Sequence, residues 1–459
     1  MKGIKFDFSN LFEPNVKNGI KESDINDNKA KIKKIINEVL EENPGFLYVP
    51  YKRKWVDRVL DLKSWVQSFD AVVVLGIGGS ALGNLALQTS LNPLNYNSMS
   101  KDKRKTPKVF VIDNVDPDYI ASVLDSIDVS RTLFNVISKS GTTAEAMSNY
   151  MIARGIIESY GLDGKDHLLF TTDPENGVLR KIADEEGIKT LEIPQSVGGR
   201  FTVLTPVGLL SAVAGGIDVI DLVNGAKDMC EKVKNDDVWE NPAALNALIH
   251  HIYYNRGYNI SVMMPYSNRL FLLADWYRQL WAESLGKRTD VEGKEVFVGQ
   301  TPVKALGATD QHSQVQLYNE GPHDKIVTFL KLEKFEREIT IPNLHEDIPA
   351  LKYLGGKKVS DLLNTELTGT EYALVEHNRP NMKVIFPEIN PYNIGQFLFA
   401  YEFQTAIMGK LLNINAYDQP GVELGKQVTY GLMGREGHEG TAKEVKEKLE
   451  GKKDIRLWF

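Results

Sequence analysis

Two stretches of the chain place glycine and hydroxyl-bearing residues directly after short apolar runs and before helix-like patterns. One reads LGIGGSALG over residues 75–83, and the other reads ISKSGTTAE over residues 137–145. The free N–H groups and the dipole at the start of a helix favour a bound anion, and Ser and Thr hydroxyls can donate further hydrogen bonds. Both stretches therefore predict a binding site for a phosphate group.

The glycine-rich stretch on its own leaves other functions open. It lacks the Lys-Ser/Thr pair of a Walker loop. It fits the loose dinucleotide-binding pattern through Gly76, Gly78 and Ala81, but Asp113, which ends the next apolar run, follows Gly78 by 35 residues instead of about 20. The glycines could also serve a tight turn alone. A nicotinamide-dependent dehydrogenase is thus one alternative that this motif permits.

The second stretch adds a dense set of hydroxyl donors at Ser138, Ser140, Thr142 and Thr143. These groups can hold a phosphate dianion and leave the rest of a ligand free for chemistry; the alternative is that they only cap a helix. In open α/β folds, ligands bind where adjacent parallel strands end. If the two runs are neighbouring strands, the two stretches converge on one site.

The elements that would position these stretches are short apolar runs separated by helix-like segments. Unalternating, β-branched runs are typical of parallel strands buried on both faces. They cover residues 71–75, 108–113, 132–138 and 167–172. A second series has strands expected at 259–266 and 325–332, and helices at 242–255, 268–285 and 393–412. The predicted fold class is α/β: two tandem α-β-α sandwiches with mostly parallel sheets, N-terminal helices and a C-terminal helical tail.

Composition narrows the function classes. The 459 residues carry a formal net charge of −7, with 42% hydrophobic and 25% charged residues, which predicts a folded protein and disfavours nucleic-acid binding. The single Cys230 excludes an internal disulfide and a cysteine-based zinc site. The N-terminus lacks the apolar core of a signal peptide, and the apolar stretch 201–222 contains Pro206 and two aspartates. We expect a cytoplasmic protein with no membrane span and a buried helix at 201–222.

Six motifs together resemble one known family. The two phosphate stretches are similar to those of the sugar-isomerase α/β domain. The other motifs are GGRFTVLTPVG (198–208), QLWAESLGK (279–287), QHSQVQLYNEG (311–321) and DQPGVELGKQ (418–427). In this order, from residue 72 to residue 427, they resemble the phosphoglucose isomerase family.

The resemblance implies both the organisation and the activity of the chain. It implies two flavodoxin-like sugar-isomerase domains, with an N-terminal helical segment at 1–60, domains at 61–220 and 221–435, and a tail at 436–459. It implies interconversion of glucose 6-phosphate and fructose 6-phosphate, a step of glycolysis and gluconeogenesis, by ring opening and an enediol. No cofactor or metal is expected, and the partners are a phosphosugar substrate and a second copy in a homodimer.

Two residues match the family's positions for the proton transfer. On a helix, Leu273, Trp276, Leu280 and Glu283 fall at spacings of three and four, which puts the Glu283 carboxylate at the edge of an apolar face. The resemblance makes Glu283 the general base. Arg200, a permanent cation that follows two glycines, holds the position that stabilises the enediolate.

The resemblance assigns roles to the remaining site residues. His312 and Lys426 match the ring-opening pair, and the family's histidine reaches the site from the neighbouring subunit, which implies a dimer. The positions expected to bind substrate are Gly79, Ser80, Ser138, Lys139, Ser140, Thr143, Glu145, Gly199 and Gln419. The sequence departs from the family pattern at Gly141, where many members carry an aromatic residue, and at Thr309-Asp310, where others have Asn-Gly.

Three alternatives to a glucose-specific isomerase stay open. A dual phosphoglucose/phosphomannose isomerase would show nearly the same motifs. The dehydrogenase would require a nicotinamide cofactor. A noncatalytic phosphosugar sensor would not require the catalytic groups Glu283 and Lys426, which are both present in this sequence. No metal-binding set is expected, because His250 and His251 are adjacent and lack the HExxH spacing of zinc proteases.

Overall fold

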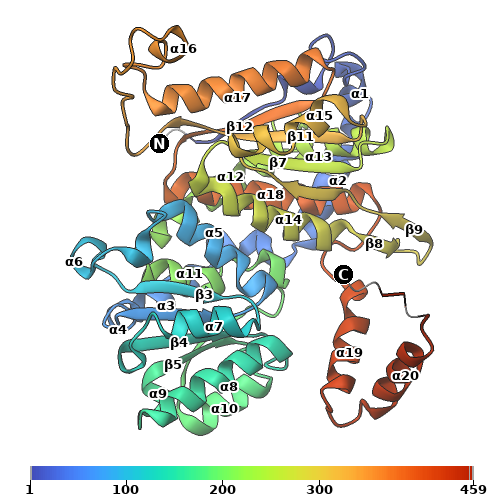
Figure 1. Ribbon diagram of the computed structural model, residues 1–459. Coiled ribbons are helices and arrows are strands. Elements are labelled where there is room, and N and C mark those ends of the chain that lie inside the picture. The colour runs from blue at the N-terminus through green and yellow to red at the C-terminus, as the bar shows by residue number, and fades with distance from the viewer. Residues whose placement is uncertain (1–2, 454, 457–459) are drawn as a thin grey trace. The chain divides into compact units, whose positions relative to one another are not determined.

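Strands and helices alternate along a computed structural model that describes residues 3–453 and 455–456 (Figure 1). The chain divides into two units, residues 1–416 and residues 417–459. The first unit contains both five-stranded sheets, and the described part of the second contains two α-helices and a short 3₁₀ helix. The α/β class predicted from the sequence is confirmed, whereas the domain boundaries expected after residues 60, 220 and 435 stay predictions.

The first sheet is entirely parallel, with the order β3-β2-β4-β5-β6. Its strands are β2 (Ala71–Leu75), β3 (Lys108–Ile112), β4 (Thr132–Ile137), β5 (Leu168–Thr172) and β6 (Lys189–Glu192). Every residue of β2, β4 and β5 is buried, which is why these runs are apolar without alternation. Strand β2 comes first in the sequence but lies between β3 and β4 in the sheet, as in flavodoxin-like folds.

The second sheet repeats this arrangement and adds an antiparallel edge strand. Its order is β1-β12-β11-β7-β10, with β1 antiparallel to β12 and all other pairs parallel. Its strands are β7 (Ile260–Pro265), β10 (Thr301–Lys304), β11 (Lys325–Lys334), β12 (Asn381–Glu388) and β1 (Lys5–Asp7). The N-terminal segment, expected to be helical, therefore also contributes a strand. Again the parallel strand that comes first in the sequence, β7, lies between the next two, β10 and β11.

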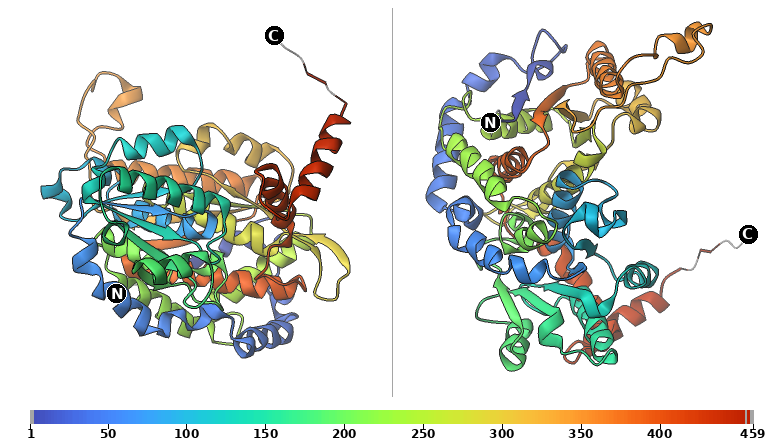
Figure 2. Two further views of the ribbon diagram at one scale, coloured as in Figure 1. Left: turned by 90° about the horizontal axis from the view of Figure 1, so that it is seen from below. Right: turned by 90° about the vertical axis from the view of Figure 1, so that its left-hand side faces the viewer.

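Helices fill the space between the two sheets (Figure 1 and Figure 2). The almost completely buried α18 (Pro391–Leu411) packs against α12 (Val219–Val233), α13 (Pro242–Asn255) and α2 (Lys29–Glu42). Beside it, α14 (Phe271–Leu285) packs against α5 (Leu82–Leu91), which joins the two α/β halves. Because α18 is surrounded by protein, it is apolar on most sides and not only on one face.

The apolar stretch 201–222 is buried, as predicted, but it contains two helices and not one. Its first helix, α11 (Pro206–Ala214), begins with Pro206 in its first turn and is buried along its whole length. The chain then turns at Gly215 and Gly216, the latter with φ of +78°, before α12 begins at Val219. Within the described residues, no helix is long and apolar enough to cross a membrane.

Shorter elements complete the first unit. The helices are α1 (Glu22–Asn26), α3 (Arg53–Asp61), α4 (Lys63–Val66), α6 (Lys101–Arg104), α7 (Pro117–Leu124), α8 (Ala144–Ser159), α9 (Gly164–His167), α10 (Val178–Glu186), α15 (Val315–Glu320), α16 (Pro349–Lys352) and α17 (Val359–Glu376). A two-stranded ribbon pairs β8 (Lys287–Thr289) with β9 (Glu295–Val298).

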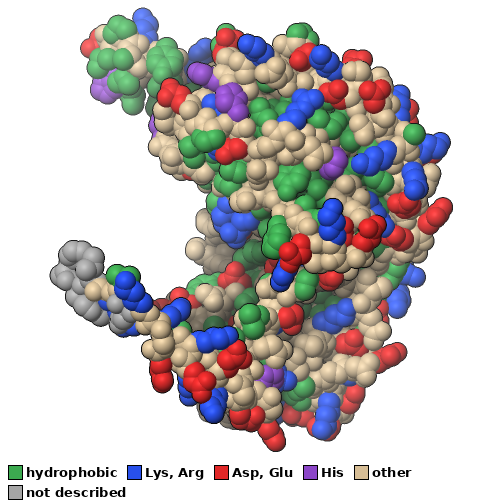
Figure 3. Space-filling model, turned by 90° about the vertical axis from the view of Figure 1, so that its right-hand side faces the viewer, with side chains coloured by type: hydrophobic (Ala, Val, Ile, Leu, Met, Phe, Trp, Pro, Cys, Tyr) green, Lys and Arg blue, Asp and Glu red, His purple; other side chains and the backbone are tan. Residues whose placement is uncertain are grey.

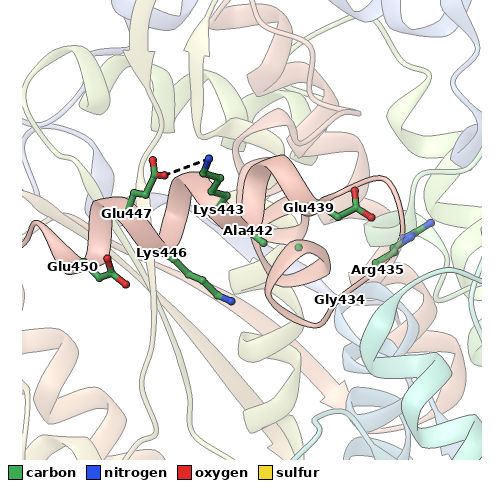
Figure 4. A pocket seen from close by; sticks show the side chains of 9 residues that line it. Gly434, Arg435, Glu439, Ala442, Lys443, Lys446, Glu447 and Glu450 are labelled. Atoms are coloured by element: carbon green, nitrogen blue, oxygen red, sulfur yellow. Dashed lines mark ion pairs between the residues drawn. The ribbon is translucent and has the colours of Figure 1, made fainter.

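The second unit is a helical hairpin of α19 (Glu423–Leu432) and α20 (Glu439–Glu450). Gly434 and Gly437, with φ of +80° and +82°, make the turn between them. Figure 4 shows a pocket along α20, lined mainly by charged side chains such as Arg435 and Lys446. Its volume is about 370 Å³. The helical tail expected at 436–459 is present as α20, whereas residues 454 and 457–459 lie outside the described residues.

Candidate functional site

The two stretches predicted to bind phosphate lie next to each other in space. β2 and β4 are hydrogen-bonded neighbours, with Leu75 opposite Val136, so the residues that follow them leave the same edge of the sheet. From β2 the chain crosses to β3 on one side of this pair, and from β4 it crosses to β5 on the other side. In folds of this type, ligands bind at the carboxyl edge of the sheet beside such a reversal of strand order.

The hydroxyl-rich loop is held in shape by its own side chains. The buried Ser138 hydroxyl accepts a hydrogen bond from the Gly141 N–H at 3.1 Å and donates to Thr143 Oγ1 at 3.4 Å. Ser140 Oγ and Thr142 Oγ1 are 2.9 Å apart. Thr143 is the residue before α8, whose first turn presents free backbone N–H groups to this loop. The predicted donors therefore surround one helix start.

Gly141 is required by the geometry of this loop. Its φ is +63°, and a Cβ atom at this position would lie 2.6 Å from the backbone N of Leu179, at the start of α10. Any other residue would strain the backbone and collide with main-chain atoms that cannot move away easily. Glycine at position 141 thus allows the close packing of α10 against the loop.

Lys139 and Glu145 flank the loop. Lys139 Nζ donates to the carbonyl oxygen of Gln195 at 2.6 Å, and burial lowers the pKa of Lys139 while the nearby Asp173 opposes that shift. Glu145 is half-buried in the first turn of α8. Acidic and basic side chains are interspersed on the face that Figure 3 displays. Because the net charge is −7, a bound phosphate must be attracted by nearby donors and cations and not by the charge of the whole chain.

The glycine loop touches the loop that carries Arg200. A Cβ atom on Gly79 would lie 2.1 Å from the carbonyl oxygen of Gly199 and 3.0 Å from the backbone N of Arg200, so only glycine fits there. Thr202 Oγ1 also donates to the Gly79 carbonyl oxygen at 3.4 Å. Ser80 ends the 3₁₀ helix η3 (Gly78–Ser80) on the same loop. The structure thus brings Gly79, Ser80, Gly199 and Arg200 together.

Arg200 is almost completely buried and forms an ion pair with Glu283. Its Nη1 lies 3.1 Å from Glu283 Oε2, its Nε donates to Ser284 Oγ at 3.0 Å, and its Nη2 donates to the Ala416 carbonyl oxygen at 3.1 Å. The guanidinium side chain is 4% exposed, whereas the carboxylate of Glu283 is 37% exposed. A fixed cation therefore orients a carboxylate that a ligand can reach.

Gln279 is a further candidate site residue, which the motifs did not single out. Its Nε2 donates to Glu283 Oε1 at 3.4 Å, and a Cβ atom on Gly78 would lie 2.9 Å from the same nitrogen. Gln279 therefore lies between the glycine loop and the predicted base. The available signal was its position four residues before Glu283 on α14, which puts both side chains on one helix face.

His312 lies apart from this hydrogen-bonded cluster. It is exposed at the end of the 3₁₀ helix η8 (Thr309–His312), and within the described residues its side chain makes no hydrogen bond to Glu283. Asp310 accepts hydrogen bonds from the Leu306 N–H at 2.6 Å and from the Ser313 hydroxyl. Burial alone would raise the pKa of Asp310, but these bonds bring it below its usual value. Asp310 thus stabilises the turn before His312.

Lys426 and Gln419 belong to the second unit. Lys426 lies in α19, with Nζ 2.7 Å from Glu423 Oε1, and is partly exposed. Gln419 directly precedes the 3₁₀ helix η9 (Pro420–Val422). The Arg200 bond to Ala416 fixes the last residue of the first unit, from which this segment begins.

Comparison with known proteins assigns the family. A family model described as phosphoglucose isomerase matches residues 60–444. The chain belongs to the phosphoglucose isomerase family. One curated relative is the glucose-6-phosphate isomerase of Carboxydothermus hydrogenoformans. It is 47% identical over 464 residues, which cover 99% of each chain.

Solved structures of similar proteins agree with this family assignment. A hypothetical protein from Thermus thermophilus is 34% identical, with a TM-score of 0.85 over 94% of this chain and 100% of that chain. A glucose-6-phosphate isomerase from Chlamydia trachomatis is 26% identical, with a TM-score of 0.74 over 86% of this chain and 77% of that chain. The phosphoglucose isomerase fold therefore extends over both α/β halves of this chain.

Proposed function

We propose that this phosphoglucose isomerase family member interconverts glucose 6-phosphate and fructose 6-phosphate, as a step of glycolysis and gluconeogenesis in the cytoplasm. The observation that carries the proposal is the Arg200–Glu283 ion pair beside the phosphate loops. A carboxylate and a fixed cation thereby lie close to a cluster of anion donors. This combination suits proton transfer on a phosphorylated sugar.

The phosphate loops serve as the handle for the substrate. Ser138, Ser140, Thr143 and the N–H groups at the start of α8 donate to the 6-phosphate, with Ser80 on the neighbouring loop. The phosphate does not react, so the binding energy released there positions C1 and C2 of the sugar. Lys139, Glu145 and Gly199 lie on or beside these loops and contact the substrate around the phosphate.

Glu283 moves the proton between the two carbons. Its carboxylate takes the proton from C2 of the open-chain aldose, and the electron pair passes through the C1–C2 bond to the carbonyl oxygen, which gives an enediolate. Arg200 stabilises the negative oxygen without giving up a proton of its own. The proton of the C2 hydroxyl passes to the C1 oxygen, Glu283 returns its own proton to C1, and the C2 oxygen becomes the carbonyl of the ketose. No electron leaves the substrate, so the step needs no redox cofactor.

Ring opening uses His312 and Lys426. Histidine can exchange a proton near neutral pH, and the lysine ammonium can protonate or stabilise the ring oxygen as the C1 hydroxyl loses its proton. We propose that His312 acts in the site of the neighbouring subunit of a homodimer, which agrees with its exposed position away from Glu283. Gln419, seven residues before Lys426, contacts the sugar hydroxyls.

A cofactor-free assay tests this function. The purified protein is mixed with fructose 6-phosphate and EDTA, without nicotinamide, and glucose 6-phosphate is measured after the protein has been removed by filtration. Formation of glucose 6-phosphate supports the proposal. Turnover only after addition of NAD or NADP would instead indicate a dehydrogenase, and binding without turnover would indicate a sensor. Parallel assays with mannose 6-phosphate identify a dual isomerase.

A further inference from the structure

The second sheet has its own reversal of strand order, which the proposed reaction does not use. In the first sheet the phosphate loops follow β2 and β4, on the two sides of the reversal. The corresponding neighbours in the second sheet are β7 and β11. Since ligands bind outside the carboxyl ends of strands at such points, the loops after β7 and β11 mark a second place to look for a site.

A cavity of about 510 Å³ lies at this place. Ser267 and Arg269 follow β7, and Lys334 to Arg337 continue from the end of β11. The end of β12 contributes Glu388, and residues 93–95, after α5, line it from the other α/β half. The volume is within the range of small-molecule sites, about 300–1,000 Å³.

The cationic side chains of this cavity exceed the acidic ones. Arg269, Lys334 and Arg337 line it, together with the carboxylates of Glu336 and Glu388. Arg269 is the fixed member, because its side chain is only 19% exposed and its Nε donates to the Ser90 carbonyl oxygen at 2.8 Å. Its Nη1 lies 2.5 Å from Glu336, which is 61% exposed. Such an exposed partner is held weakly, so an incoming dianion can replace it.

Two helices connect the cavity to the proposed active site. Helix α14 begins two residues after Arg269 and carries Glu283 near its other end, about 20 Å away along the helix. Helix α5 begins after Ser80 of the glycine loop and ends before the cavity residues 93–95. The two helices lie side by side (Figure 1). The Arg269–Ser90 bond joins them at the cavity end, and Gln279 approaches Gly78 at the other.

We propose that this cavity is a second binding site, for a small metabolite that carries a phosphate monoester, and that its occupancy is transmitted to Glu283 through α5 and α14. The phosphate replaces Glu336 on Arg269 and is contacted by Lys334 and Arg337. Because Arg269 also holds the end of α5, a change in its bonding shifts α14 relative to the glycine loop. The binding part stands without the isomerase activity, whereas the transmission rests on the proposed function.

Binding is tested by titration calorimetry of the full-length protein with glycerol 3-phosphate. The wild type is expected to bind two molecules per chain, one at each sheet. The variant Lys334→Ala/Arg337→Ala, which changes only exposed side chains, should bind one molecule per chain or bind the second about tenfold or more weakly. The control Lys352→Ala/Lys357→Ala removes two charges from the same loop outside the cavity and should match the wild type. A single molecule per wild-type chain, or equal binding by all three proteins, would overturn the site.

Transmission is tested by the dependence of kcat on glycerol 3-phosphate at saturating fructose 6-phosphate, where competition at the active site is suppressed. The wild type and the Lys352→Ala/Lys357→Ala control should change kcat with the same concentration dependence that calorimetry gives for the second site. The Lys334→Ala/Arg337→Ala variant should keep the basal kcat and lose this dependence. A wild-type kcat that stays constant while the second site fills would refute the transmission and leave the binding result intact. Absence of any turnover would instead count against the proposed function.

Discussion

Arg200 and Glu283 form an ion pair that joins the two α/β halves, with Nη1 3.1 Å from Oε2. Arg200 follows the first sheet in the 3₁₀ helix η6 (Gly199–Phe201), and Glu283 lies on α14 beside the second. Neither half contains both groups, so the pair exists only when the halves are packed together. The interface between the two repeats is therefore also where the proposed chemistry is assembled.

Replacing Arg200 with lysine is expected to lower both stability and activity. A lysine keeps the charge, but its single nitrogen cannot replace the three guanidinium nitrogens that contact Glu283, Ser284 and Ala416. We expect Arg200→Lys to lower the free energy of unfolding by about 2 kcal/mol or more and kcat/KM by about 10²-fold. Urea unfolding and steady-state kinetics measure the two effects.

The matched control is Arg256→Lys. Arg256 also pairs with a carboxylate, with Nη2 2.8 Å from Asp24, but its side chain is 37% exposed. This exposed pair should contribute less than about 1 kcal/mol. Equal effects of the two substitutions on stability and on kcat/KM would show that the buried position of Arg200 has no special role.

Gly141→Ala is expected to damage the phosphate loop more than Gly161→Ala does. Both glycines have positive φ, +63° and +68°, so both variants bear the same backbone strain of about 1 kcal/mol. Only the Gly141 variant also collides with the backbone N of Leu179, whereas nothing lies within 4 Å of a Cβ atom on Gly161. Gly141→Ala should therefore raise KM for fructose 6-phosphate, which Gly161→Ala should leave unchanged. A normal KM in both would disconnect this loop from substrate binding.

Cross-subunit action of His312 predicts complementation between inactive variants. In a mixed dimer of His312→Ala and Glu283→Gln chains, one site combines an intact Glu283 with an intact histidine from the other chain. After dissociation and random reassociation, the mixture should regain about a quarter of wild-type activity, because half of the dimers carry one working site of two. If both groups act within one chain, no activity returns on mixing.

Stability is expected to fall as the pH drops from 6.5 toward 4, partly because of His250. Burial lowers the pKa of His250 to about 4, although its hydrogen bond to Gln300 opposes the shift. The unfolded chain takes up this proton near pH 6.5, so unfolding is favoured by acid in this range. The expected loss at pH 5 relative to neutral pH is about 2 kcal/mol for this group.

The pH effect is measured by urea unfolding of the wild type and His250→Asn at pH 7.5 and pH 5. The variant should lose less stability between the two pH values. The adjacent His251, whose pKa burial also lowers to about 4, adds a dependence that both proteins retain. His345→Asn is the exposed control and should follow the wild type. An identical pH dependence in His250→Asn and the wild type would contradict the assignment.

Local sequence patterns were sufficient for the strands and the loops after them. The runs predicted at 71–75 and 259–266 became β2 and β7 within one residue, because strands buried on both faces must be apolar throughout. The adjacency of β2 and β4 was expected only as a possibility of the fold class. This adjacency brings the glycine stretch and the hydroxyl stretch to one edge of the sheet, and no residue in either stretch indicates that the two strands pair.

Contacts between distant segments could not be read from the sequence. The Arg200–Glu283 pair and the pairing of β1 with β12 join residues far apart in the chain, which leave no periodic pattern. Gln279 escaped notice because a glutamine on a helix is usually a solvated side chain. The turn at Gly215–Gly216 divided an apolar stretch that hydrophobicity alone presented as one helix.

The most direct test of the proposed chemistry is the turnover of Glu283→Gln. Glutamine retains the shape and can still accept a hydrogen bond from Arg200, but it cannot take up the C2 proton. We predict that kcat falls by about 10²-fold or more while binding of fructose 6-phosphate and urea unfolding stay close to wild type, and that the exposed control Glu292→Gln is unaffected. Near-normal turnover by a folded Glu283→Gln protein would contradict the role of Glu283 as the base.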